Sequence, residues 1–144
     1  MICSDFLSLK IKDLMRTNVV TVAADQSVYD AVQTMIPSNI GAVVVLEPKN
    51  GAVAGILTER DLMTRVIAKA LDPKTTLVRE VMTEVPATLG SQLPATEVFS
   101  LLKARNFRHV PIVDKGRLVG MISIRDVFEI LHKIIGDALF ETEK

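Results

Sequence analysis

The sequence predicts a mixed α/β (α+β) fold made of two copies of one β-α-β-β-α unit, with small sheets packed against helices. The first observation is a repeat: Gly55-Ile56-Leu57-Thr58-Glu59-Arg60-Asp61 recurs later in the chain as Gly120-Met121-Ile122-Ser123-Ile124-Arg125-Asp126. The second is that each copy carries an amphipathic helical pattern followed by two β-branched apolar runs. The third is an aliphatic composition with five Phe, one Tyr and no Trp. Duplication on this scale determines the architecture before any local pattern does.

The duplication extends over most of the chain. Ile11-Lys12-Asp13-Leu14-Met15 matches Val78-Arg79-Glu80-Val81-Met82, and Val43 matches Val110 at the same separation along the chain. The separation then becomes slightly shorter, because the turn Glu47–Gly51 is longer than the turn Asp114–Gly116. Hairpin turns tolerate such insertions. We therefore predict a first copy over residues 9–72 and a second over residues 77–136.

In the first copy the pattern predicts five elements in the order extended, helix, strand, strand, helix. They are Val19–Val22, Ser27–Ile36, Ala42–Leu46, Val53–Leu57 and Glu59–Leu71. Pro37 should alter how the first helix ends, and Asp72-Pro73 should stop the second.

The second copy repeats this order. The predicted elements are Pro86–Leu89, Pro94–Arg105, Val110–Val113, Leu118–Ile122 and Ile124–Ile135. Pro94 suits the start of a helix, because its missing N–H is not needed there. The last helix is broadly apolar, so we expect it to supply core residues and, with its surplus, an oligomer face.

Composition excludes several classes of function. The 17 basic and 17 acidic residues cancel, so no global field favours nucleic acid or an anionic membrane. A single cysteine, Cys3, excludes an internal disulfide and fits a reducing compartment. The longest apolar runs are too short to span a membrane, and no signal-peptide pattern is seen. We expect a cytoplasmic protein without a membrane segment.

The repeated motif ends in a hydroxyl residue and, three residues later, an aspartate: Thr58 with Asp61, and Ser123 with Asp126. At a strand-to-helix junction this spacing is typical of a capping box, in which the two residues satisfy free N–H groups of the helix. The same end of a helix also attracts anions, and a carboxylate can accept hydrogen bonds from a vicinal diol. Phosphate plus diol describes a ribonucleotide, so capping and ligand binding both stay open.

Two further features favour a ligand. Arg60 and Arg125 lie in the same helical turn as the aspartates, although a solvated arginine is the simpler explanation of each. Arg105, Arg108 and His109 form a basic cluster before a buried strand of the second copy, where the first copy has Ser38, Gly41 and Ala42. The Asp126 copy is therefore the better candidate for a nucleotide site, and we expect the Asp61 copy to bind weakly or stay empty.

The order of elements and motifs resembles the CBS domain family. The second copy carries the nearest match, Phe107-Arg108-His109-Val110-Pro111-Ile112-Val113-Asp114 followed by Gly116-Arg117-Leu118-Val119-Gly120-Met121-Ile122-Ser123-Ile124-Arg125-Asp126. Two copies in tandem look like a CBS pair, or Bateman module, and the resemblance runs from about Leu9 to Ile135. It implies a pseudo-two-fold relation between the repeats and dimerisation through helices.

The resemblance also implies adenine nucleotides such as AMP, ADP or ATP as regulatory ligands, in clefts between the repeats. Carried over by position, one site would use Ser123, Arg125, Asp126, Arg108 and His109 with Thr17, Gly41 and Ala42. The other would use Thr58, Arg60, Asp61 and Thr83, bordered by Arg108 and His109. Val20 and Ile40 are candidates for contact with adenine, although core packing is the simpler explanation of each.

The predicted function is a regulatory module that binds an adenine nucleotide, forms a homodimer and signals to a separate protein. It needs no cofactor, and no catalytic set is visible. His109 and His132 have no cysteine or carboxylate at metal-ligand spacing, so no metal site is expected. The alternatives are a ligand-free interaction module or a sensor of another adenosyl ligand, such as S-adenosylmethionine. Scarce aromatic residues disfavour single-stranded nucleic acid.

Overall fold

The computed structural model describes residues 7–85, 87–105 and 108–142, with side chains other than those of residues 104–105 and 138–142. Cys3, Pro86 and Phe107, which the sequence singled out, lie outside the described residues, and so does the side chain of Arg105. The chain forms two compact units. We call residues 18–86 with 116–118 the Asp61 unit, and residues up to 17 with 87–115 and from 119 onward the Asp126 unit.

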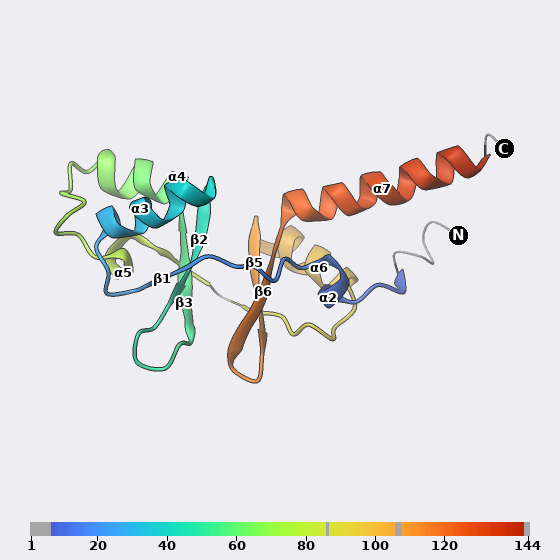
Figure 1. Cartoon of the computed structure of the whole chain (residues 1–144), viewed down its shortest axis with the longest axis horizontal. Coiled ribbons are helices and arrows are strands. Elements are labelled where there is room, and N and C mark those ends of the chain that lie inside the picture. The colour runs from blue at the N-terminus through green and yellow to red at the C-terminus, as the bar shows by residue number, and fades with distance from the viewer. Residues whose placement is uncertain (1–6, 86, 106–107, 143–144) are drawn as a thin grey trace. The chain divides into compact units, whose positions relative to one another are not determined.

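The Asp61 unit is built on a four-stranded sheet in the order β1-β2-β3-β4 (Figure 1). Its elements are β1 (Thr21–Ala23), α3 (Val28–Ser38), β2 (Ala42–Leu46), β3 (Val53–Thr58), α4 (Glu59–Asp61), the π-helix η1 (Leu62–Ile67), α5 (Val78–Val81) and β4 (Thr83–Glu84). β1 pairs with β2 in parallel, whereas β2 with β3 and β3 with β4 are antiparallel. Ala42 pairs with Thr58, so the β2–β3 hairpin delivers the motif residues directly to α4.

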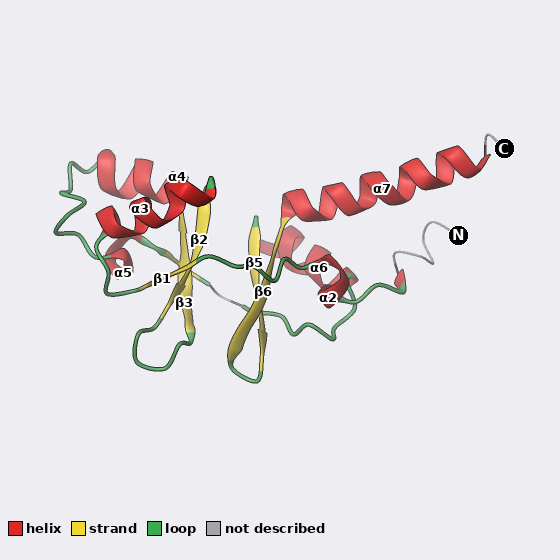
Figure 2. Ribbon diagram, in the orientation of Figure 1, coloured by secondary structure: helices red, strands yellow, loops and turns green. Residues whose placement is uncertain are grey.

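The Asp126 unit contains a β-hairpin that leads directly into a long helix (Figure 2). Its elements are α2 (Ile11–Leu14), α6 (Thr96–Arg105), β5 (His109–Asp114), β6 (Arg117–Ser123, whose first two residues group with the Asp61 unit) and α7 (Ile124–Thr142). Two isolated bridges extend the hairpin, a parallel one between Leu89 and Ile112 and an antiparallel one between Arg16 and Met121. They repeat the pairings that β1 and β4 make in the other unit.

Each compact unit contains the leading segment of the opposite repeat in place of its own. Ile11 and Leu14 belong to a buried cluster with Val110 and Ile112 of the second copy. Conversely, Val78 and Val81, which open the second copy in sequence, pack in the core of the Asp61 unit with Val43 and Leu57. Backbone hydrogen bonds fix the exchange, since Ile11 N donates to Leu93 O and Val78 N donates to Gln26 O, each at 2.9 Å. Each unit is therefore completed by the leading segment of the opposite repeat.

The mixed fold of small sheets and helices is confirmed, and most predicted strands are close to the observed ones. β2 has the predicted bounds, and β3 extends one position further than predicted. The extended segment predicted at Pro86–Leu89 is reduced to the bridge at Leu89 within the described residues. α2, α5 and β4 were not predicted, because such short elements carry no measurable period.

Helix ends differ from the prediction more than strands do. The helix predicted at Glu59–Leu71 is a single α-turn followed by the π-helix, and it closes before Ala70, whose φ is +53°. α3 continues through Pro37 to Ser38, since a proline in the last turn removes only one hydrogen bond, and Asn39 ends the helix in the left-handed region with a φ of +52°. α7 continues past Ile135 to Thr142.

Candidate functional site

Asp126 lies in the first turn of α7 with only 6% of its surface exposed. Its Oδ2 accepts hydrogen bonds from the backbone N–H and the hydroxyl of Ser123, both at 2.9 Å. In return, the N–H of Asp126 donates to Ser123 Oγ at 3.2 Å. This reciprocal arrangement satisfies free N–H groups at the helix start, as the capping interpretation predicts.

Arg16 occupies the other carboxylate oxygen. Its Nε donates to Asp126 Oδ1 at 2.6 Å, although the two residues are far apart in the sequence. The backbone holds the arginine in place, because Arg16 N donates to Met121 O and Met121 N donates to Arg16 O. The ion pair is asymmetric in burial: the side chain of Arg16 is 59% exposed and that of Asp126 is 7% exposed.

The glycine of each repeated motif makes this backbone pairing possible. A Cβ on Gly120 would lie 2.8 Å from Arg16 O, and a Cβ on Gly55 would lie 2.6 Å from Thr83 O. Both distances are shorter than carbon and oxygen tolerate without a shift of backbone. The motif therefore begins with glycine because another segment of backbone passes directly over it.

Asp61 is capped in the same way but held by a different partner. Thr58 N donates to Asp61 Oδ2 at 3.0 Å, and Asp61 N donates to Thr58 Oγ1 at 3.1 Å. The hydroxyl of Thr83 donates to Asp61 Oδ1 at 2.9 Å, which is the place that Arg16 takes at Asp126. Arg65 Nε lies 3.9 Å from the same oxygen, but its Nη1 donates to Met82 O at 2.8 Å and to Val81 O at 3.3 Å.

Equivalent positions near the two aspartates also differ in charge. Glu59 N donates to Gly41 O, and the Glu59 carboxyl group covers Gly41 so closely that a Cβ there would lie 3.0 Å from Glu59 Cδ. In the second copy Ile124 N donates to Arg108 O. A carboxylate in the first copy thus replaces the apolar Ile124, and a glycine replaces Arg108.

His109 is the titratable neighbour of Asp126. Burial lowers the pKa of His109 below its ordinary value of 6.5; the Asp126 carboxylate opposes this shift, and the Arg108 guanidinium reinforces it. The imidazole is therefore neutral at pH 7 and can donate or accept a hydrogen bond. Ser123, Asp126, Arg108 and His109, four predicted site residues, are brought together in one unit.

The family model for the CBS domain matches residues 11–68 and 78–133, which together make up most of the chain. This chain belongs to the CBS domain family. Among curated proteins it is 36% identical over 135 residues to the mitochondrial CBS domain-containing protein CBSX3 of Arabidopsis thaliana. That match covers 86% of this chain and 65% of the plant protein, so this chain spans about two thirds of its relative's length.

Solved CBS structures agree in fold. The CBS-domain containing protein ATU1752 from Agrobacterium tumefaciens is 36% identical, with a TM-score of 0.72 over 83% of this chain and 91% of that one. A hexameric CBS-CP12 protein from bloom-forming cyanobacteria is 30% identical, with a TM-score of 0.74 over 83% of this chain and 69% of that one. No described helix of this CBS protein is both long and apolar enough to cross a membrane.

The remaining predicted site residues are either exposed or packed in the core. Arg125 is 83% exposed and pairs with Glu129 at 3.5 Å, and Arg60 and Thr17 are exposed. Val20 and Ile40 pack against the core of the Asp61 unit, as the packing explanation predicts, and Ala42 is buried there. Contact of any of these with a ligand stays a prediction.

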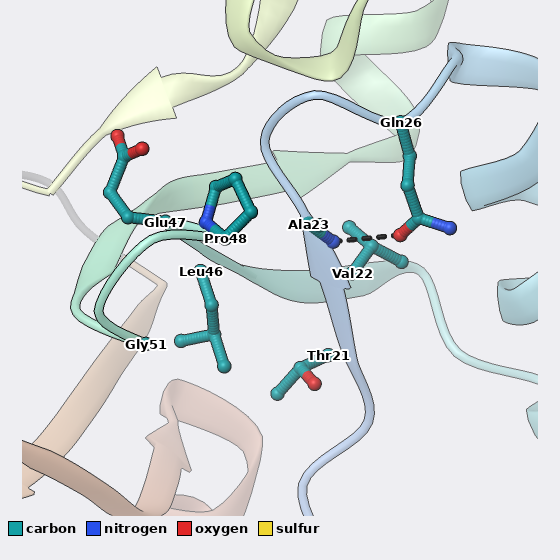
Figure 3. Close-up of a pocket in the computed structure, with 8 residues that line it drawn as sticks. All are labelled: Thr21, Val22, Ala23, Gln26, Leu46, Glu47, Pro48 and Gly51. Atoms are coloured by element: carbon teal, nitrogen blue, oxygen red, sulfur yellow. Dashed lines mark hydrogen bonds between the residues drawn. The ribbon is translucent and has the colours of Figure 1, made fainter.

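A pocket of about 260 Å³ lies elsewhere in the CBS fold, at the turn end of the β2–β3 hairpin (Figure 3). It is lined by Thr21, Val22, Ala23, Gln26, Leu46, Glu47, Pro48 and Gly51. Gln26 is engaged by the backbone N–H of Ala23, and Glu47 by Arg79. Thr58 lies at the opposite end of β3 and Asp61 follows it, so this pocket is separate from the Asp61 group.

Sequence reasoning missed three residues that contact or flank the two capped aspartates: Arg16, Arg65 and Glu59. Arg16 could have been found from the repeat itself, since it directly follows Met15 just as Thr83, which was predicted, directly follows Met82. Glu59 and Arg65 differ from their equivalents Ile124 and Ile130, a contrast of charge that the alignment of the copies contains. Only the fold shows that each contacts or flanks the capped aspartate.

Proposed function

We propose that this chain is a regulatory CBS-pair module that binds an adenine nucleotide, AMP, ADP or ATP, with Asp126 as the ribose-binding carboxylate. It carries out no chemical step, works in the cytoplasm and signals to a separate partner protein. The Asp61 group is its weaker counterpart. The ligand acts by binding two arrangements of the module with different affinity, since only that difference can shift an equilibrium.

The observation that carries the proposal is a buried carboxylate at the start of the 19-residue helix α7, bonded to Arg16 and close to His109, which in turn lies close to Arg108. A carboxylate offers about four lone pairs, of which Ser123 and Arg16 use three. One acceptor is open, and rotation of the Ser123 hydroxyl releases another. Two acceptors are what a ribose diol needs, and the helix dipole and the guanidinium favour a phosphate nearby.

Isothermal titration calorimetry with AMP, ADP and ATP tests the proposal, with Asp126→Asn and Asp61→Asn as matched variants. Asn keeps the size and part of the cap but loses an acceptor and the charge. We expect Asp126→Asn to abolish the main binding event and Asp61→Asn to leave it in place. Absence of heat with AMP, ADP and ATP would overturn the proposal, and heat with S-adenosylmethionine alone would favour the alternative adenosyl ligand.

A second function, a ligand-free interaction module, is favoured by one observation. Every buried side-chain nitrogen and oxygen among the described residues already has a hydrogen-bond partner, the two aspartates included. In that case Asp61 and Asp126 act only as caps. The Asn variants would then lower thermal stability without any effect on binding, and the wild-type chain would bind no nucleotide.

We further propose that the chain is a homodimer that associates through α7. Ile124, Phe128 and Ile135 are 36%, 62% and 47% exposed, and their spacing along the helix returns each of them to nearly the same angle. They form one apolar stripe along α7. The related cyanobacterial CBS-CP12 protein is hexameric, which supports self-association in the family.

A further inference from the structure

The two capped aspartates receive a different chemical group at equivalent positions. Asp126 Oδ1 accepts from the Arg16 guanidinium at 2.6 Å, and Asp61 Oδ1 accepts from the Thr83 hydroxyl at 2.9 Å. Each donor lies on a backbone segment that pairs with the motif strand beside its glycine. Arg16 pairs with Met121, and Thr83 pairs with Ile56. Because the scaffold is the same, the difference lies in the side chain alone.

The Arg16 guanidinium has more N–H donors than its contact with Asp126 uses. A guanidinium carries five N–H groups, and the contact with Asp126 uses the one on Nε. This guanidinium makes no other hydrogen bond within the described residues, and the side chain is 59% exposed. The Nη face is therefore available to a bound group while Nε continues to neutralise the buried carboxylate. Such a planar fork matches the oxygens of a phosphate.

The Asp61 group has the opposite electrostatic character. Thr83 adds no charge, and the Glu59 carboxylate covers Gly41. The nearby cation, Arg65, donates hydrogen bonds from Nη1 to the carbonyl oxygens of Val81 and Met82 at the end of α5. An anion placed near Asp61 would meet a carboxylate, whereas an anion placed near Asp126 would meet Arg16 with Arg108 in the same unit.

We propose that Arg16 is the specificity-determining residue of the Asp126 site, and that it selects a phosphorylated nucleoside over the uncharged nucleoside. The inference rests on the proposed function and names the ligand charge that this site takes. Arg16 holds Asp126 through Nε and binds the phosphate through its Nη groups, so recognition of ribose and of phosphate is coupled through one side chain. The base contributes nothing to this choice.

The experiment compares adenosine with AMP and ATP by calorimetry on the full chain. Arg16→Thr installs the residue found at position 83 and should weaken AMP binding about tenfold or more, the loss expected for a hydrogen bond to a charged group. Adenosine affinity should change much less, because a threonine hydroxyl at this position can hold Asp126 as Thr83 holds Asp61. Arg16→Lys should keep part of the AMP preference, and raising the salt concentration should weaken AMP binding less in Arg16→Thr than in the wild type. Arg117→Thr is the matched control, since it removes the same charge from an exposed strand residue outside both proposed sites, and it should leave the AMP-to-adenosine ratio alone.

Each failure has a distinct signature. If Arg16→Thr loses as much affinity for adenosine as for AMP, Arg16 is a structural residue only. If the ratio of the AMP affinity to the adenosine affinity is unchanged, Arg16 has no role in selection. Either result overturns this inference. A shift of the ratio in Arg117→Thr as large as that in Arg16→Thr would do the same. If the wild-type chain binds none of adenosine, AMP and ATP, both the proposed function and this inference are wrong. Thermal melts of each variant show whether it is folded.

Discussion

At the scale of single residues, the glycines of the repeated motif have the most direct physical role. Gly55 and Gly120 lie under backbone that comes from a segment outside their own copy, close enough to exclude any side chain. The sequence reveals the glycine but not the reason for it, because the covering strand is far away along the chain. The cap residues are different, since Thr58 and Asp61 can be predicted from spacing alone.

We predict that Gly120→Ala lowers the free energy of unfolding by about 1 to 3 kcal/mol, because its Cβ would force backbone at Arg16 to move. Urea unfolding followed by circular dichroism measures the change. Gly136→Ala is the control: it lies in α7 with nothing within 4 Å of the added Cβ, and it should be neutral or stabilise by about 0.5 to 1 kcal/mol. Equal stability of wild type and Gly120→Ala would contradict the steric argument.

His109 should make stability depend on pH. Burial lowers its pKa in the folded state, so below the ordinary value of 6.5 the unfolded chain binds more protons than the folded one. Stability is therefore lost as the pH falls through that value towards the folded pKa. We expect His109→Gln to flatten the pH dependence of the urea midpoint between about pH 7 and pH 5. An unchanged slope in His109→Gln would contradict this assignment.

The candidate site could be predicted from sequence only in part. The capped aspartates and their hydroxyl partners were found because they are local, within one helical turn of each other. Arg16 was missed because its partner Asp126 is distant in the sequence and nothing in a local pattern marks the contact. Arg16 is equivalent to Thr83 in the repeat, but a guanidinium and a hydroxyl share no chemical pattern that would mark the two positions as one site.

At the scale of elements, the strands were predicted better than the helix ends. β2 and β3 are runs of β-branched residues bounded by turns, and this is a strong signal. The π-helix after Asp61 could not be predicted, since Leu62–Ile67 keeps an ordinary helical pattern. β4 and α5 are short and gain their stability from packing in the Asp61 unit, which no local propensity records.

We predict that Ser27→Ala destabilises α3 and lowers the free energy of unfolding by about 0.5 to 2 kcal/mol. Ser27 Oγ accepts from Asp30 N at 3.1 Å at the start of this helix, and alanine leaves that N–H without its partner. Ser38→Ala, at the exposed far end of the same helix, should change stability by less than about 0.5 kcal/mol. Thermal unfolding compares the two; similar losses would show that the cap is not the cause.

At the scale of the whole molecule, the main question is what covers the apolar stripe of α7. The sequence predicted surplus apolar residues there, and the structure adds their exposure. Burial of a phenylalanine is worth about 1.5 to 3 kcal/mol, so Phe128 alone could contribute much to a dimer.

We therefore predict that Phe128→Asp converts a dimer into a monomer, as measured by sedimentation velocity. The control is Leu77→Asp, which places a charge on another exposed apolar residue; Leu77 precedes α5, where aspartate is a favoured cap. It should keep the sedimentation coefficient of the wild type. A wild-type chain that is monomeric at every concentration, or a Phe128→Asp variant that stays dimeric, would contradict the prediction.

The crossing of leading segments between the repeats has a consequence for how such a chain can arise. A single repeat, cut free, would keep its own leading helix but lose the leading helix and the neighbouring edge backbone that the opposite repeat supplies to its core. It could bury that core only by borrowing the same pieces from a second molecule, which is domain swapping. An unduplicated ancestor would thus have been an intertwined dimer, and gene fusion would have joined two chains that already depended on each other.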